Sequence, residues 1–114
     1  MLPWYIHAMY DHNQLEVPDS FVALHLGPSG LKPGATRALV TARYELCEEL
    51  AQHLQEYARA QHFDAELPVG EVLDRCHQGL LAGPSGLSED EATWVVRRLA
   101  ELADWVWPGP NPTA

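Results

Sequence analysis

Apolar residues recur every three or four positions between residues 36 and 62, which is the spacing of an amphipathic helix. They form one stripe on a helical wheel, made of Leu39, Leu46, Cys47, Leu50, Leu54, Tyr57 and Ala58. The opposite side is polar and carries Glu45, Glu48, Glu49, Gln52 and Glu56. Thr36 precedes the pattern, and its hydroxyl oxygen is suited to cap the helix N-terminus. The sequence therefore predicts one long helix over residues 36–62.

A second helix is predicted after a loop around residues 63–67. Pro68 suits its first position, where the missing amide hydrogen costs nothing. Its buried face is expected to consist of Val69, Val72, Leu73, Cys76 and Leu80. Gly79 and Gly83 follow this pattern and are expected to end the helix.

A third helix is predicted to begin at Ser88, because Glu91 three residues later completes a capping box. It is expected to run to about Trp105 and to stop before Pro108. Its core face is expected to consist of Ala92, Val95, Val96, Leu99, Leu102, Ala103 and Val106.

The N-terminal third of the chain has a different pattern. Residues 1–20 mix large aromatics with turn-forming residues, and we interpret them as an arm that lies on its own domain or on a neighbour. The apolar run over residues 21–26 favours a strand, with one buried helical turn as the alternative. Residues 27–34 are rich in glycine and proline and predict a turn.

These elements predict a mainly α fold: a three-helix domain with one long helix, an N-terminal aromatic arm and one short β-strand or hairpin. The length of 114 residues corresponds to a single domain, which we place over residues 1–107 with residues 1–20 as the arm. Residues 108–114 are expected to form a flexible tail.

The net charge of the chain limits the classes of partner that it is expected to bind. Seven Lys and Arg residues oppose sixteen Asp and Glu residues, so the net charge is −9. Such a surface repels nucleic acids and anionic membranes and favours basic or apolar partners. There is no apolar run of the length that a transmembrane helix needs. Cys47 and Cys76 both fall on apolar helix faces, which suits reduced thiols in a cytoplasmic protein.

Candidate chemistry is sparse. The order of predicted strand, glycine-rich loop and helix resembles a phosphate-binding site, but Lys32 precedes Pro33 and Gly34 instead of opening the helix after the second glycine. Weaker anion binding by Lys32 and Arg37 remains a prediction. The common hydrolase and metalloprotease motifs are absent from the sequence, so an enzyme is not favoured and no cofactor is expected.

Metal binding has two weak candidates. If the first two helices form an antiparallel hairpin, His53 and His77 come out nearly level on the flanks of their apolar stripes. Two imidazoles alone make a poor site, and Glu49 or Asp74 would have to complete it. The alternative is a pair of half-exposed histidines at the edge of the core, and no metal site is predicted.

Arg43 interrupts the apolar stripe of the first helix. A buried guanidinium needs an acceptor, or it must extend to solvent. In one interpretation it pairs with a carboxylate or a loop carbonyl of its own chain. In the other it faces a pocket or an interface and binds an anionic group.

The third helix carries two tryptophans opposite its core face. Trp94 and Trp105 fall together on the wheel with Arg98 between them, and a guanidinium could stack between the indoles. Either the aromatic arm covers this stripe or another subunit does. Trp94, Arg98 and Trp105 are therefore the predicted interface residues, together with Trp4 and Tyr5 of the arm.

Residues 41–50, 71–81 and 94–102 resemble a group of short proteobacterial proteins often labelled "ATPase with chaperone activity". The resemblance covers about residues 15–107 and implies a small helical family, and the label implies an ATP site. It assigns no role to any residue.

Taken together, the sequence favours a small non-enzymatic protein-interaction or regulatory domain that forms a homodimer or joins a protein partner. The alternative is a protein that binds a small molecule or an anion, including a nucleotide, through Arg43 or the loop from Gly27 to Gly34.

Overall fold

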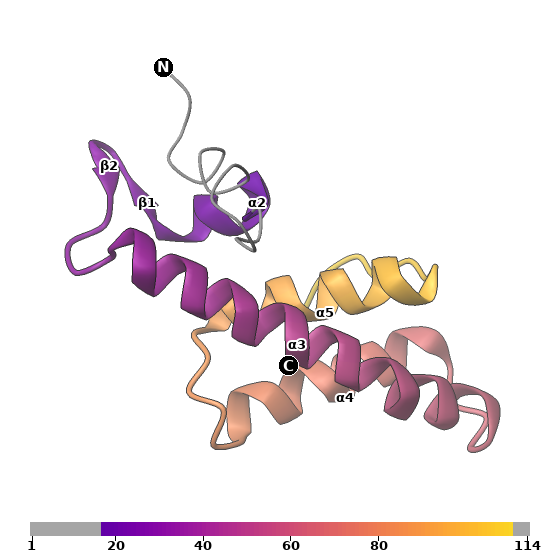
Figure 1. Ribbon diagram of the computed structural model, residues 1–114. Helices are drawn as coiled ribbons and strands as arrows, with labels where there is room; N and C mark the ends of the chain where they lie inside the picture. The colour runs from indigo at the N-terminus through magenta and orange to yellow at the C-terminus, as the bar shows by residue number, and fades with distance from the viewer. Residues whose placement is uncertain (1–16, 111–114) are drawn as a thin grey trace, which may run out of the picture. The chain divides into compact units, whose positions relative to one another are not determined.

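The computed structural model describes residues 17–110 (Figure 1). The chain divides into two compact units, Met1–Leu46 and Cys47–Ala114. The elements in chain order are α2 (Asp19–Val22), the 3-10 turn η2 (Ala23–His25), β1 (Leu26–Gly27), β2 (Gly30–Leu31), α3 (Arg37–Phe63), α4 (Val69–Ala82) and α5 (Glu89–Ala103). The predicted fold class is therefore confirmed: the protein is mainly helical, with one long helix and a small hairpin.

The apolar run over residues 21–26 is mostly helical, so the predicted strand is wrong and the alternative of one buried helical turn is correct. The carbonyl of Pro18 accepts hydrogen bonds from the amides of Phe21 and Val22, both at 3.0 Å, and starts helix α2. Phe21 and Val22 are neighbours and both are buried. A strand with one buried face alternates instead, so this pair of adjacent core residues suits a helical turn.

The hairpin that follows is short and antiparallel. Leu26 pairs with Leu31 and Gly27 pairs with Gly30, which leaves Pro28 and Ser29 as a two-residue connection. Gly30 has a φ of 120°, a conformation that side chains with a Cβ rarely adopt. The hairpin therefore depends on glycine at this position.

Helix α3 begins where the sequence predicted. The Thr36 hydroxyl accepts a hydrogen bond from the Leu39 amide at 3.1 Å, so its role as the N-cap is confirmed. In the first unit the helix contributes Val40 and Tyr44 to a core around Phe21, whose ring lies 5.7 Å from that of Tyr44 in an edge-on arrangement.

The buried line of α3 is rotated from the predicted stripe by about 60° on a wheel of 100° per residue. Within the second unit the fully buried positions of this helix are Cys47, Ala51 and Ala58. Leu50 and Leu54 of the predicted stripe are only partly buried, and Leu39 and Tyr57 are exposed. Small side chains let neighbouring elements approach closely, and a wheel weighted by hydrophobicity underestimates them.

Helix α4 has the buried face that the sequence predicted, except that Val69 is only partly buried. Val72, Leu73, Cys76 and Leu80 are buried, and His77 joins them. Gly83 follows the last helical residue as predicted, whereas Gly79 lies inside the helix and its carbonyl accepts from the Gly83 amide at 2.9 Å. Both cysteines are buried thiols, and burial raises the pKa of Cys76 to about 11.

Helix α5 packs against α4 and begins with the predicted capping box. The Ser88 hydroxyl accepts from the Glu91 amide, and the Glu91 carboxylate accepts from the Ser88 amide, both at 3.1 Å. This reciprocal pair satisfies two amides that would otherwise lack partners at the helix start.

The end of α5 differs from the prediction. The helix ends at Ala103 because Asp104 adopts a left-handed conformation with a φ of 61°. The Asp104 amide then donates to the Glu101 carbonyl at 3.1 Å, and the Trp105 amide donates to the Ala100 carbonyl at 2.8 Å. These two bonds are the Schellman motif that often ends helices. Trp105 therefore lies beyond the helix.

Asp104→Gly is expected to stabilise the protein by about 1 kcal/mol, because glycine adopts the left-handed conformation without the steric cost of a Cβ. Urea unfolding followed by circular dichroism measures this change. The same residue introduced three positions earlier, in Glu101→Gly, serves as the control and is expected to destabilise the helix by about 1 kcal/mol. A loss of stability in Asp104→Gly would contradict the assigned helix end.

None of the helices within residues 17–110 combines the length and the apolar character needed to cross a lipid bilayer.

Candidate protein interface

The structure separates the three residues that were predicted to form one interface stripe on α5. Trp94 is buried, with 8% of its surface exposed, so it is not available as an exposed anchor. Trp105 is partly exposed but lies past the end of the helix. Trp4 and Tyr5 fall outside the described residues. The helical wheel had placed Trp94 and Trp105 together because it extended α5 by two residues.

Arg98 connects helices α5 and α3 within the second unit. Its guanidinium Nε lies 2.8 Å from Oε1 of Glu48, and a second nitrogen donates to Oε2 at 3.2 Å. Gln52, one turn along α3, also donates to Oε2 of Glu48 at 2.7 Å. A bidentate arginine–carboxylate pair fixes both distance and orientation. Arg98 therefore orients the packing of α5 against α3.

Acid is expected to weaken this connection. Burial raises the pKa of Glu48, but hydrogen bonds from Arg98 and Gln52 and the attraction of the Arg98 charge outweigh it, so the pKa lies below its ordinary value of 4.5. A carboxyl whose folded-state pKa is lowered stabilises the fold above its unfolded value, and this contribution is lost as the pH falls through the folded pKa. Urea midpoints measured from about pH 7 to about pH 3 should therefore fall less steeply for Glu48→Gln than for the wild type.

The matched control for this pH series is Glu49→Gln, which removes an exposed carboxylate at the next position of the same helix. Its urea midpoints are expected to follow the wild-type pH dependence. Equal slopes for Glu48→Gln and the wild type would show that the pair with Arg98 contributes nothing to the acid sensitivity.

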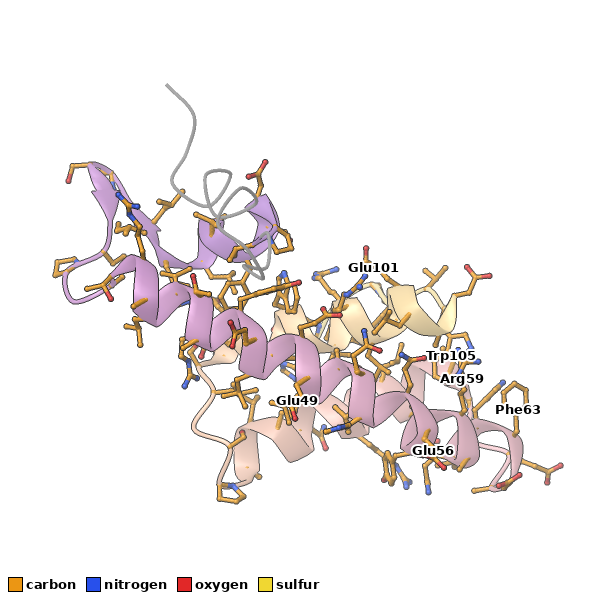
Figure 2. The ribbon with its side chains drawn as sticks, in the orientation of Figure 1. Glu49, Glu56, Arg59, Phe63, Glu101 and Trp105 are labelled. Carbon is orange, nitrogen blue, oxygen red and sulfur yellow. The ribbon has the colours of Figure 1, made fainter. Side chains whose placement is uncertain are left out.

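A second cluster, which we call the aromatic end, lies where α3 ends and the chain leaves α5. It consists of Arg59, His62, Phe63 and Trp105, and Val106 is the next residue along the chain after Trp105. The His62 ring lies 4.7 Å from the Phe63 ring and 5.4 Å from the Trp105 ring, edge-on to both. Figure 2 shows Arg59, Phe63 and Trp105 gathered at this end of the unit. Residues at the end of α3 and after α5, at least 42 positions apart in sequence, thus form one aromatic surface.

Polar contacts hold the aromatic end in place. Nδ1 of His62 donates to the Leu67 carbonyl at 2.7 Å, which ties the ring to the loop after α3. Arg59 donates to the Leu102 carbonyl at 3.3 Å, in the last turn of α5. A cation is favoured there because the carbonyl end of a helix carries a partial negative charge. These two contacts and the Schellman motif position the cluster.

The apolar residues at the aromatic end are largely exposed. Phe63 exposes 64% of its surface and Val106 exposes 87%, and Trp105 is partly exposed. Val106 was predicted to be a core residue, which is wrong because the helix ends before it. The sequence pattern predicts a loop at Phe63, whereas Phe63 is the last residue of α3 and falls on the polar side of its wheel. An aromatic residue on the polar side of a helix was the signal that could have identified this surface.

Three exposed carboxylates lie close in the chain to members of the aromatic end. Glu56 precedes Arg59 by three positions and Phe63 by seven on α3, a spacing that places the three residues on one side of the helix. Asp64 directly follows Phe63, and Asp104 directly precedes Trp105. All three carboxylates are exposed, and across the described stretch 17–110 no ion pair reaches any of them. The surface is therefore apolar at its centre and acidic at its edge.

A third cluster joins α4, α5 and the segment after α5. Trp107 donates from its indole nitrogen to Oδ1 of Asp74 at 2.9 Å, and its ring lies 5.7 Å from that of His77. The Arg97 guanidinium lies 5.6 Å from the centre of the same indole. His77 also lies within hydrogen-bonding distance of the Thr93 hydroxyl, at 3.1 Å. This cluster fastens the C-terminal segment onto the two helices.

The two histidines predicted as weak metal candidates, His53 and His77, have different surroundings from each other in the structure. His77 is buried beside Thr93 and Trp107, whereas His53 is exposed on α3. Residues 17–110 contain no group of three or more His, Cys, Asp and Glu side chains that could hold a metal ion.

The anion candidates lie in the first unit. Lys32 and Arg37 are exposed, and Arg43 is partly exposed. The Lys32 amide donates to the His25 carbonyl and the Ala35 amide donates to the Lys32 carbonyl, both at 2.9 Å. These two amides of the loop are therefore already used within the chain. Anion binding by the three cationic side chains stays a prediction.

Comparison with known proteins gives no relative: no family model, no curated protein and no solved structure matches the chain.

Proposed function

We propose that this protein is a small non-enzymatic interaction or regulatory domain that binds a second protein chain through the aromatic end. The observation that carries the proposal is the exposure of Phe63 and Val106 beside Trp105 and Arg59. Exposed apolar clusters with polar edges are typical of protein-interaction sites. Tryptophan and arginine are among the residues that contribute most to binding at such sites.

The way the cluster is held supports this function. Binding loses free energy when it has to order mobile side chains and loops. Here His62 is fixed by the Leu67 carbonyl, Arg59 by the Leu102 carbonyl, and the main chain before Trp105 by the end of α5. The surface is therefore organised before a partner arrives.

The partner is a protein chain in the cytoplasm, either a second copy in a homodimer or a different protein. A photo-crosslinking amino acid, benzoylphenylalanine, placed at Phe63 in the intact chain tests both forms. It keeps an aromatic side chain at the exposed site. After irradiation in cells, we expect one dominant adduct, with twice the mass of the chain for a homodimer and a different mass for another partner. Mass spectrometry identifies the adduct.

The same crosslinker at Gln78, an exposed position of α4, is the matched control and should not give this adduct. Val106→Ser and Trp105→Ala are each expected to reduce the Phe63 adduct by about tenfold or more, as the loss of a central contact does. The absence of a defined adduct at Phe63, or the same adducts from both positions, would overturn the proposal.

A further inference from the structure

The second unit holds nearly all the net charge of the protein. From the sequence, Cys47–Ala114 contains twelve Asp and Glu residues against four arginines, a net charge of −8 out of the total of −9. Met1–Leu46 has four acidic residues against three basic ones, a net charge of −1. The aromatic end therefore lies on the strongly acidic part of the chain.

Within residues 17–110, none of the four arginines of this unit forms an ion pair with Glu56, Asp64 or Asp104. Arg75 pairs with Glu71 at 3.1 Å, and Arg98 pairs with Glu48. Arg97 lies over Trp107, and Arg59 donates to a main-chain carbonyl. The carboxylates beside the aromatic rings thus keep their charge available for an external cation.

We propose that the occupant of the aromatic end is a basic segment of another protein, in which Arg or Lys side chains alternate with apolar residues; this rests on the proposed interaction function. The apolar residues cover Phe63 and Val106, and the cations meet Glu56, Asp64 and Asp104. Guanidinium and ammonium groups also bind favourably over the faces of indole and phenyl rings. A basic segment with alternating apolar residues therefore complements both the apolar centre and the acidic edge of the surface.

The alternative occupant, a second copy, is disfavoured by the same charges. A homodimer through this surface brings together two units that each carry a net charge of −8. Like charges placed across an interface cost free energy, whereas complementary charges accelerate association and select the partner. Charge complementarity therefore favours the basic partner.

The experiment uses the full chain and three synthetic peptides of about twelve residues that share four Leu and Phe positions. The peptides differ at their other variable positions, which are Arg in the first peptide, Gln in the second and Glu in the third. Titration calorimetry gives the affinities, and amide shifts in NMR spectra locate the site. We expect the Arg peptide to shift residues around Phe63 and Trp105 and to bind about tenfold more tightly than the Gln peptide. Its affinity should fall between ~50 mM and ~300 mM NaCl.

Charge variants of the protein make the test specific. Glu56→Gln with Asp64→Asn removes two carboxylates of the acidic edge and is expected to weaken binding of the Arg peptide by about three- to tenfold. Glu49→Gln with Glu89→Gln removes the same charge at exposed positions elsewhere in the unit and is expected to leave the affinity unchanged. Equal weakening by the two double variants would overturn the proposal, since net charge alone would then explain binding.

Two further outcomes separate this proposal from the one it rests on. If the Gln peptide binds as tightly as the Arg peptide, without salt dependence, and Phe63→Ser removes binding, the interaction function stands and the basic partner is wrong. If no peptide binds but the chain dimerises in sedimentation and Phe63→Ser makes it monomeric, the occupant is a second copy. The absence of both peptide binding and a Phe63 crosslink overturns both proposals.

Discussion

Replacing Trp107 by alanine is expected to destabilise the protein by about 3–5 kcal/mol, as truncations of buried aromatic side chains generally do. Trp107 is 7% exposed and has three kinds of contact: a hydrogen bond to Asp74, a ring contact with His77 and the Arg97 guanidinium over its indole. Its loss leaves a cavity against α4 and α5. Because single domains unfold with only about 5–15 kcal/mol, the expected loss is a large part of the total.

Urea unfolding followed by circular dichroism measures this loss, and Trp105→Ala is its matched control. Trp105 is the same residue type two positions earlier in the same segment, but it is partly exposed, so its truncation is expected to cost clearly less. Equal losses for the two variants would contradict the assignment of Trp107 as the residue that fastens the segment.

The hydrogen bond to Asp74 can be tested separately from the packing. Asp74→Asn keeps an oxygen that accepts from the Trp107 indole, and is expected to change stability little. Asp74→Ala removes the acceptor and leaves a buried donor without a partner, which typically costs about 1–3 kcal/mol. An Asp74→Ala variant as stable as Asp74→Asn would show that the bond is dispensable.

Trp105 and Trp107 therefore have different roles although they are two residues apart. Trp107 is buried between the helices, and the αL conformation of Asp104 turns the chain so that Trp105 meets His62 instead. The buried Trp107 follows Trp105 in the chain and the end of α5 precedes it. These two fixed points hold the partly exposed Trp105 indole in position. A surface that binds a partner gains affinity from such preorganisation.

Local chemistry allowed parts of the fold to be predicted from the sequence. The capping box of Ser88 and Glu91 and the N-cap at Thr36 involve residues three positions apart, so the sequence contains the whole interaction. The buried face of α4 was equally predictable, because its large apolar residues point to one side. Such signals do not depend on the rest of the structure.

Other features depend on contacts that the sequence pattern does not contain. The buried line of α3 follows Ala51 and Ala58, which a wheel weights less than leucine, although close packing favours small residues. Asp104 takes a conformation usually occupied by glycine, so the end of α5 had no glycine to mark it. The aromatic end was missed for the same reason: its rings come together only after both helix ends are placed correctly.

Leu73→Ala is expected to destabilise the protein by about 2–5 kcal/mol, because Leu73 is fully buried on α4 and its truncation leaves a cavity in the core of the second unit. Leu81→Ala provides the matched control: it makes the same chemical change in the same helix, at a position that is 43% exposed. Both variants exchange leucine for alanine in the same helix, so the difference between their free energies of unfolding reports mainly the burial of Leu73. The difference is expected to be at least about 1.5 kcal/mol, and equal midpoints would contradict the packing of α4 against α5.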